Sequence, residues 1–104
     1  MKDYTNLLEE KFQNEVEQTP LGEPQVWLSL ESGRSVEITL ESDGLPEEEW
    51  YYSVRLHCSE EEFDKGEYES TMGVIDSLIG SCIDSAATAL GMLLDMHDEE
   101  LVCE

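Results

Sequence analysis

The segment at residues 70–97 reads STMGVIDSLIGSCIDSAATALGMLLDMH and is the longest apolar stretch of the chain. Its apolar positions recur every three or four residues, which predicts one long helix with a wide apolar face. These positions are Val74, Ile75, Leu78, Ile79, Cys82, Ile83, Ala86, Leu90, Leu93 and Leu94. The rest of the chain is then expected to cover that face or to carry charge.

A helix of this length does not match the other elements that the sequence predicts. It would be about 42 Å long, whereas a nine-residue strand spans about 30 Å. Either the helix breaks near Gly80 or Gly91, or its surplus apolar face meets a partner or a second copy of the chain. The second outcome predicts a homodimer through Ser81–Leu94. The predicted helix also carries a ridge of small residues, which consists of Gly73, Ser77, Gly80, Ala87 and Gly91. This ridge either lets the backbone of a second copy come close or packs on the sheet.

An amphipathic helix is predicted at the start of the chain. Asp3 can cap this helix, and Pro20 and Gly22 end it. Its apolar face would be formed by Tyr4, Leu7, Leu8, Phe12 and Val16.

From Gln25 onward the apolar residues alternate with polar ones, which predicts a β-hairpin. The apolar set is Val26, Leu28, Leu30, Val36, Ile38 and Leu40. A three-residue loop centred on Gly33 would pair Leu30 with Val36 and keep all six side chains on one face. A third strand is predicted at Trp50–Cys58, where the alternation is strict.

Ser59 and Glu62 form a predicted capping box, which begins a short helical turn that carries Phe63 inward. Together these elements predict one α+β domain over residues 1–104. Its parts are an N-terminal helix, a three-stranded antiparallel β-meander and a long C-terminal helix packed on the sheet. The residues expected in the core include Leu28, Ile38, Val54, Ile75, Ile79 and Leu90.

Charge is the strongest compositional signal. Twenty-six acidic residues face five basic ones, for a formal net charge of −21 at pH 7. Direct binding to nucleic acid or to an anionic membrane is disfavoured, because the phosphates would be repelled. A basic partner is favoured instead. The alternative is acidity that serves only solubility, and net charge favours neither partner binding nor solubility over the other.

The cysteines are odd in number and share no C-x-x-C spacing, which argues against a disulfide framework and against a zinc site. No signal peptide is evident at Met1, so a reducing cytoplasm is expected. Asp76, Asp84 and three glycines make residues 70–97 a poor membrane span. We expect no cofactor.

Catalytic motifs are not found in the sequence, and we expect a protein that is not an enzyme. Neither an EF-hand pattern nor a phosphate-binding loop is present. His57 and Cys58 are neighbours in a predicted strand, so they point to opposite faces and cannot form a catalytic dyad. Cys58 is expected in the core and His57 at the surface.

The polar face of the predicted sheet and the acidic runs are the candidate partner-binding surface. Trp27 and Tyr51 would lie among charges there, as aromatics of binding surfaces do, unless the N-terminal helix covers that face. The two acidic runs flank the third strand about 30 Å apart, which is roughly one turn of duplex DNA. The candidate residues are Trp27, Glu37, Glu41, Asp43, Glu47, Glu48, Glu49, Tyr51, Glu60, Glu61 and Glu62.

In size, acidity and its order of helix, three strands and helix, the chain resembles the small acidic anti-CRISPR proteins of phages and mobile elements. The runs Glu47-Glu48-Glu49 and Glu60-Glu61-Glu62 are similar in kind to the acidic runs of that group. Certain members mimic the DNA duplex that Cas9 reads next to its target. The resemblance therefore implies an inhibitor that blocks the DNA or RNA site of a CRISPR-Cas effector nuclease.

Two other functions fit the same features. One is an immunity protein that neutralises a basic nuclease toxin. The other is a dimeric adaptor that uses the long helix as its interface and is acidic only for solubility.

Overall fold

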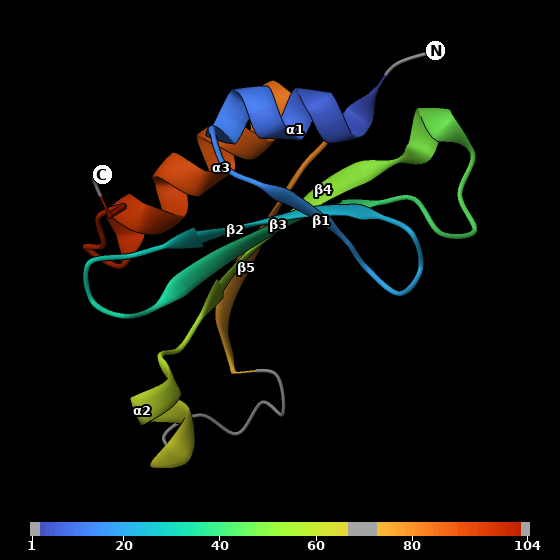
Figure 1. Cartoon of the computed structure of the whole chain (residues 1–104). Coiled ribbons are helices and arrows are strands. Elements are labelled where there is room, and N and C mark those ends of the chain that lie inside the picture. Colours follow the sequence, from blue (N-terminus) through green and yellow to red (C-terminus); the bar gives the residue numbers. More distant parts are fainter. Residues whose placement is uncertain (1–2, 67–72, 103–104) are drawn as a thin grey trace.

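A five-stranded antiparallel sheet with two helices on one face forms the protein (Figure 1). The computed structural model describes residues 3–66 and 73–102. The strands follow the order β1-β2-β3-β4-β5, so each pairs with its neighbour in the chain. The elements are α1 (Tyr4–Phe12), β1 (Val16–Gln18), β2 (Pro24–Ser29), β3 (Ser35–Glu41), the 3-10 helix η1 (Glu47–Glu49), β4 (Tyr51–His57), α2 (Glu60–Asp64), β5 (Val74–Gly80) and α3 (Ile83–Met96). The α+β class is confirmed, and the predicted three-stranded meander lacks β1 and β5.

The prediction of one helix over residues 70–97 is wrong in its first half. Val74–Gly80 is the edge strand β5, and α3 begins only at Ile83. Residues 70–72 lie outside the described residues. A short apolar run fits helix and strand periods alike, and the β-branched Val74, Ile75 and Ile79 favour a strand once β4 offers an edge.

The single helix was expected to break near Gly80 or Gly91, and instead a strand ends at Gly80 and a helix follows it. This change of structure at Gly80 has a packing cause. A Cβ atom built on Gly80 would lie 2.6 Å from the backbone nitrogen of Ala86 and 2.8 Å from the carbonyl carbon of Ser85. The end of β5 therefore touches the first turn of α3, and only glycine fits there. Cys82 caps α3, since its sulfur accepts a hydrogen bond from the Ser85 N–H.

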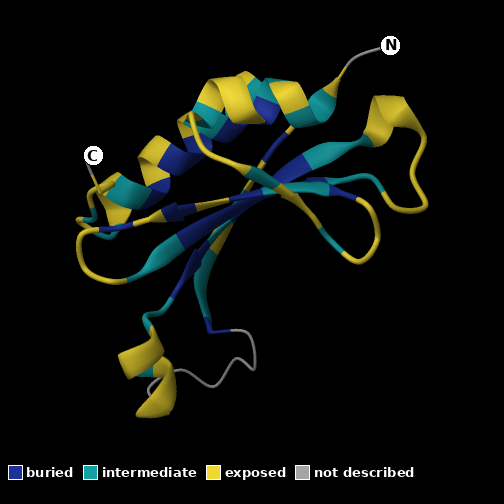
Figure 2. Ribbon diagram, viewed as in Figure 1, coloured by how far each residue is buried: buried dark blue, intermediate teal, exposed yellow. Residues whose placement is uncertain are grey.

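One face of the sheet is apolar, and both long helices cover it. Leu8 of α1 and Ala86, Leu90 and Leu93 of α3 are buried against it. Figure 2 shows the buried side of each helix turned toward the sheet. The sheet supplies Val26, Leu28, Leu30, Val36, Ile38, Leu40, Tyr52, Val54 and Leu56. Because α1 and α3 share this face, the N-terminal helix does not cover the polar face.

The β2–β3 hairpin keeps the predicted face but shifts the predicted register by two residues. Leu28 lies opposite Val36, whereas Leu30 was expected there. The Leu30 N–H donates to the Arg34 carbonyl oxygen at 3.0 Å, which leaves a three-residue loop between them. Gly33 has a φ of 93° at the last loop position, where such loops need a left-handed residue. An even shift leaves every side chain on its original face.

Two predicted helix starts are confirmed. The Asp3 side chain accepts from the Asn6 N–H at the start of α1, and Ser59 and Glu62 form the predicted capping box of α2. However, α1 ends at Phe12, because Gln13 takes a left-handed conformation with a φ of 50°. Val16 is therefore in β1 and not in the helix.

Several burial predictions need correction. Ile79 is 70% exposed, since strand alternation places it on the polar face, and Phe63 is 48% exposed. Ile75 is half-buried, and Cys58 is half-buried rather than in the core. His57, expected at the surface, is buried. Leu28, Ile38, Val54 and Leu90 are buried as predicted.

The premise of the dimer prediction also changes. Gly73 precedes β5, Ser77 and Gly80 lie in β5, and Ala87 and Gly91 lie in α3, so these small residues form no ridge on one helix. With 14 residues, α3 is about 21 Å long and does not outrun the sheet. Self-association through residues 81–94 stays a prediction without that support. In the described part of the chain, no helix is long and apolar enough to cross a membrane.

Gly80 and Gly91 allow a paired test of the β5–α3 contact. Gly80→Ala should lower the free energy of unfolding by about 1–3 kcal/mol, because the new methyl group overpacks backbone atoms. Gly91 lies on the exposed side of α3 with nothing within 4 Å of an added Cβ. Gly91→Ala should therefore raise stability by about 0.5–1 kcal/mol. Urea unfolding of both variants measures this, and equal effects would contradict the contact.

Candidate functional site

The face of the sheet that no helix covers carries a connected polar network. Trp27 of β2 lies opposite Glu37 of β3, and Glu37 lies opposite Arg55 of β4. Antiparallel pairing places directly opposed residues on the same face, so the register alone brings these side chains together.

Glu37 is the centre of this network, and its side chain is only 3% exposed. Its Oε2 atom accepts from Arg55 Nη1 at 2.7 Å and from Thr39 Oγ1 at 2.6 Å. Its Oε1 atom lies 3.0 Å from His57 Nε2, which beside an ionised carboxylate carries the proton. Arg55 also donates to Glu41 at 3.0 Å.

These contacts decide the charge state of Glu37. Burial alone would raise the pKa of its carboxyl group. The hydrogen bonds from His57 and Thr39, together with the positive charge of Arg55, outweigh burial and lower the pKa from 4.5 to about 2. Glu37 thus stays ionised, and a partner's cation would have to displace groups of this chain to reach it.

The two predicted aromatic residues are both on this face. Trp27 is 39% exposed and packs on His57, with ring centroids 4.8 Å apart. Its indole N–H donates to Gln25 Oε1 at 2.9 Å, which fixes the ring. Tyr51 is half-buried opposite Glu41.

The first acidic run forms an exposed turn before β4. Asp43, Glu47, Glu48 and Glu49 are all exposed there. Within residues 3–66 and 73–102, none of these carboxylates belongs to an ion pair, and Tyr4 donates its hydroxyl to Glu47 at 2.6 Å. That hydrogen bond is the main reason why the pKa of Tyr4 rises to about 12.

Glu23, which the sequence placed in a linker, holds this turn. It is only 4% exposed, and its Oε2 atom accepts from the backbone N–H groups of Ser42 at 2.6 Å and Asp43 at 3.0 Å. The only sequence signal was an acid next to Pro24, and nothing in it points to a contact 19 residues away.

Two of the three acids in the second run, Glu61 and Glu62, pair with basic residues of the same chain. Arg34 Nε and Nη2 donate to the two Glu62 oxygens at 2.9 and 2.8 Å, and this contact, first among several, lowers the pKa of Glu62 to about 2. Glu61 pairs with Lys65 at 2.9 Å. Glu60 is exposed at the start of α2, as is Asp64 at its end.

The two runs lie at opposite ends of β4, as predicted. The strand between them is shorter than predicted, because β4 has seven residues and spans about 23 Å rather than the expected 30 Å or so. Glu37 and Glu41, expected to connect the runs, are both held by Arg55. The free carboxylates therefore form separate regions and not one continuous surface.

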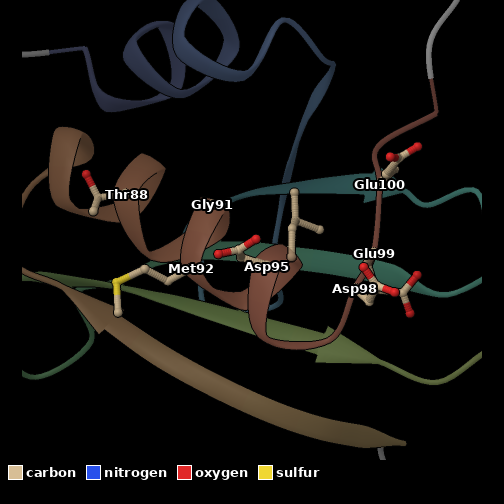
Figure 3. A pocket seen from close by; sticks show the side chains of 8 residues that line it. Thr88, Gly91, Met92, Asp95, Asp98, Glu99 and Glu100 are labelled. Atoms are coloured by element: carbon tan, nitrogen blue, oxygen red, sulfur yellow. The ribbon is translucent and has the colours of Figure 1, made fainter.

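A third acidic region, which the sequence reasoning missed, lies at the end of α3. A hollow of about 480 Å³ is lined there by Asp95, Asp98, Glu99 and Glu100. Figure 3 shows these carboxylates spread along its rim rather than converging on one point. In the described part of the chain, no group of three or more His, Cys, Asp or Glu side chains could hold a metal ion. The run of acids from Asp95 to Glu100 was the available signal.

Comparison with known proteins finds no matching family model, no similar curated protein and no similar solved structure.

The pKa of Glu37 predicts a specific pH dependence. A folded-state pKa below the unfolded value contributes stability that is present above the unfolded value and is lost as pH falls toward the folded one. For Glu37 this window runs from about pH 5 down to about pH 2, and the contribution is about 3 kcal/mol at most. Glu37→Gln should remove it.

Urea unfolding across this pH range tests that expectation. The stability difference between wild type and Glu37→Gln should be largest near neutral pH and shrink as the solution is acidified. The exposed Glu48 provides the control, and Glu48→Gln should differ little from wild type at any pH. A Glu37→Gln difference that does not change with pH would contradict the network.

Proposed function

We propose that this protein is an acidic inhibitor that binds a basic nucleic-acid-binding protein and occupies its DNA or RNA site. We propose further that this partner is a CRISPR-Cas effector nuclease. One observation carries the first step. Every Lys and Arg side chain in the described part of the chain is already paired with a carboxylate of the chain itself. These bases are Lys11, Arg34, Arg55 and Lys65.

Among the residues that the structure describes, no cation neutralises the exposed turn of Asp43 and Glu47–Glu49. Its carboxylates are available to the cations of another molecule, and the net charge of −21 would steer such a molecule toward the protein. A groove that binds duplex DNA is built to neutralise one charge per about 1.7 Å of helix axis. Carboxylates at comparable density would satisfy the same lysines and arginines.

Two contacts hold this turn in place, which favours a role in recognition over a role in solubility alone. Glu23 holds the backbone where the turn begins, and Tyr4 holds Glu47 at its helical end. A preordered set of charges loses less conformational entropy when a partner binds. Acids that serve solubility alone need no such support.

Charge reversal in the turn tests this proposal. Glu48→Lys combined with Glu49→Lys should weaken binding and slow association, because the changed side chains would repel the partner's cations. Glu47 is left intact, since it holds Tyr4. The control reverses two exposed acids elsewhere, Glu9→Lys with Glu15→Lys, and changes the net charge equally. The control should lose much less affinity.

The measurement is DNA cleavage by purified, guide-loaded Cas effector nucleases, with binding followed by surface plasmon resonance. We expect one effector to be inhibited, target nucleic acid to compete with the inhibitor, and added salt to weaken binding. A partner that holds this protein and its nucleic acid together would contradict mimicry. Inhibition of a nuclease toxin but of no Cas effector would identify an immunity protein instead.

A further inference from the structure

A hollow beside Trp27, at the α2 end of the open sheet face, combines exposed aromatic rings with free carboxylates. Its volume is about 450 Å³, and its lining includes Trp27, His57, Ser59, Glu60, Phe63 and Asp64. Figure 1 shows α2 on the side of the sheet opposite α1 and α3, so no long helix closes this space. We propose that the hollow is the anchor site for an arginine side chain of the partner protein.

The aromatic walls come from two separate elements. Trp27 of β2 is 39% exposed and Phe63 of α2 is 48% exposed, yet both line the same hollow. Large aromatic side chains that remain open to solvent in one hollow are typical of binding sites. His57 packs on one side of Trp27, and Gln25 holds its indole N–H, so the ring is positioned before any ligand arrives.

The carboxylates of the hollow belong to Glu60 and Asp64. They are four residues apart in α2 and therefore share one side of the helix. The two acids between them are already paired, Glu61 with Lys65 and Glu62 with Arg34. Within residues 3–66 and 73–102, Glu60 and Asp64 belong to no ion pair. The side of α2 that faces the hollow is thus the side whose acids are not neutralised.

This combination selects a planar cation. A guanidinium group stacks on an aromatic face and directs several N–H donors outward in its own plane. Stacked on Trp27 or Phe63, it would direct donors at the carboxylates on α2, which are good acceptors for charged donors. A phosphate or another anion would be repelled by the same carboxylates. The compact ammonium group of lysine has no flat surface with which to stack.

The inference rests on the proposed function for the source of the arginine. Grooves that bind nucleic acid are rich in arginine, so a partner of that class can supply the side chain. The chemistry of the hollow is nevertheless testable without any partner.

The test is an NMR titration of the full-length ¹⁵N-labelled protein with N-acetyl-arginine amide near neutral pH. The indole N–H signal of Trp27 should shift and saturate. Trp50 provides an internal control, because its indole donates to the Leu45 carbonyl oxygen before the other end of β4. Its signal should not move. N-acetyl-citrulline amide, which has nearly the same shape but no charge, should cause no shift.

Variants then locate the site. Glu60→Gln with Asp64→Asn should weaken binding of the arginine probe roughly three- to tenfold, as expected for two exposed charge contacts. Glu48→Gln with Glu49→Gln removes the same charge from the distant turn and should change affinity less than about twofold. Phe63→Leu keeps an apolar side chain without the ring and should also weaken binding. The spectrum of each variant shows whether it is folded.

Equal binding of the citrulline probe, or an equal loss in both double variants, would overturn the arginine site. So would a Trp27 signal that does not move, and an N-acetyl-lysine amide probe that binds equally well would overturn the choice of arginine. These failures are distinct from failure of the proposed function. Inhibition of a nuclease without arginine binding would remove only the anchor site. Arginine binding without inhibition would remove only the proposed function.

Discussion

The sheet has a single apolar face, and the rest of the structure follows from that constraint. Both α1 and α3 must pack on this face to bury their apolar sides, so neither helix is available to cover the opposite face of the sheet. The second face is left to polar residues that receive no helical cover. Buried charges there are tolerable only when they are paired and hydrogen-bonded. Glu37, Arg55, Thr39 and His57 meet this requirement among themselves.

The same constraint distributes the charge of the protein. Both arginines are used where they connect parts of the fold: Arg55 lies at the centre of the open face, and Arg34 joins α2 to Glu99 after α3. Within residues 3–66 and 73–102, most of the exposed acids therefore have no internal counterion, and they gather in turns and at helix ends. Such a charge distribution presents strong negative potential to a basic partner. The few cations stabilise the fold by pairing with certain acids. The acids that they leave unpaired are the ones that would bind a partner.

Local patterns predicted local structure well and long-range contacts poorly. The capping residues Asp3 and Ser59 and the apolar face of the β2–β3 hairpin are as expected, because each depends on neighbours within a few residues. The site was predicted in part. The acidic turn and Trp27 are exposed, whereas Glu37 is buried, and Glu23 and Phe63 were not assigned their observed places. Those outcomes depend on contacts with other elements.

By itself, the sequence determined the acidity, the class of fold, the helix caps and which side chains of each hairpin strand share a face. The acidity follows from composition. The other features follow from periods of two or 3.6 residues, which can be recognised within a short stretch of sequence. The tertiary structure decided that residues 74–80 form a strand, because the free edge of β4 pairs with them. It also decided that Gly80 must touch α3 and that Glu37 is neutralised within the sheet. A local pattern cannot specify these contacts, since their energy comes from atoms far apart in the chain.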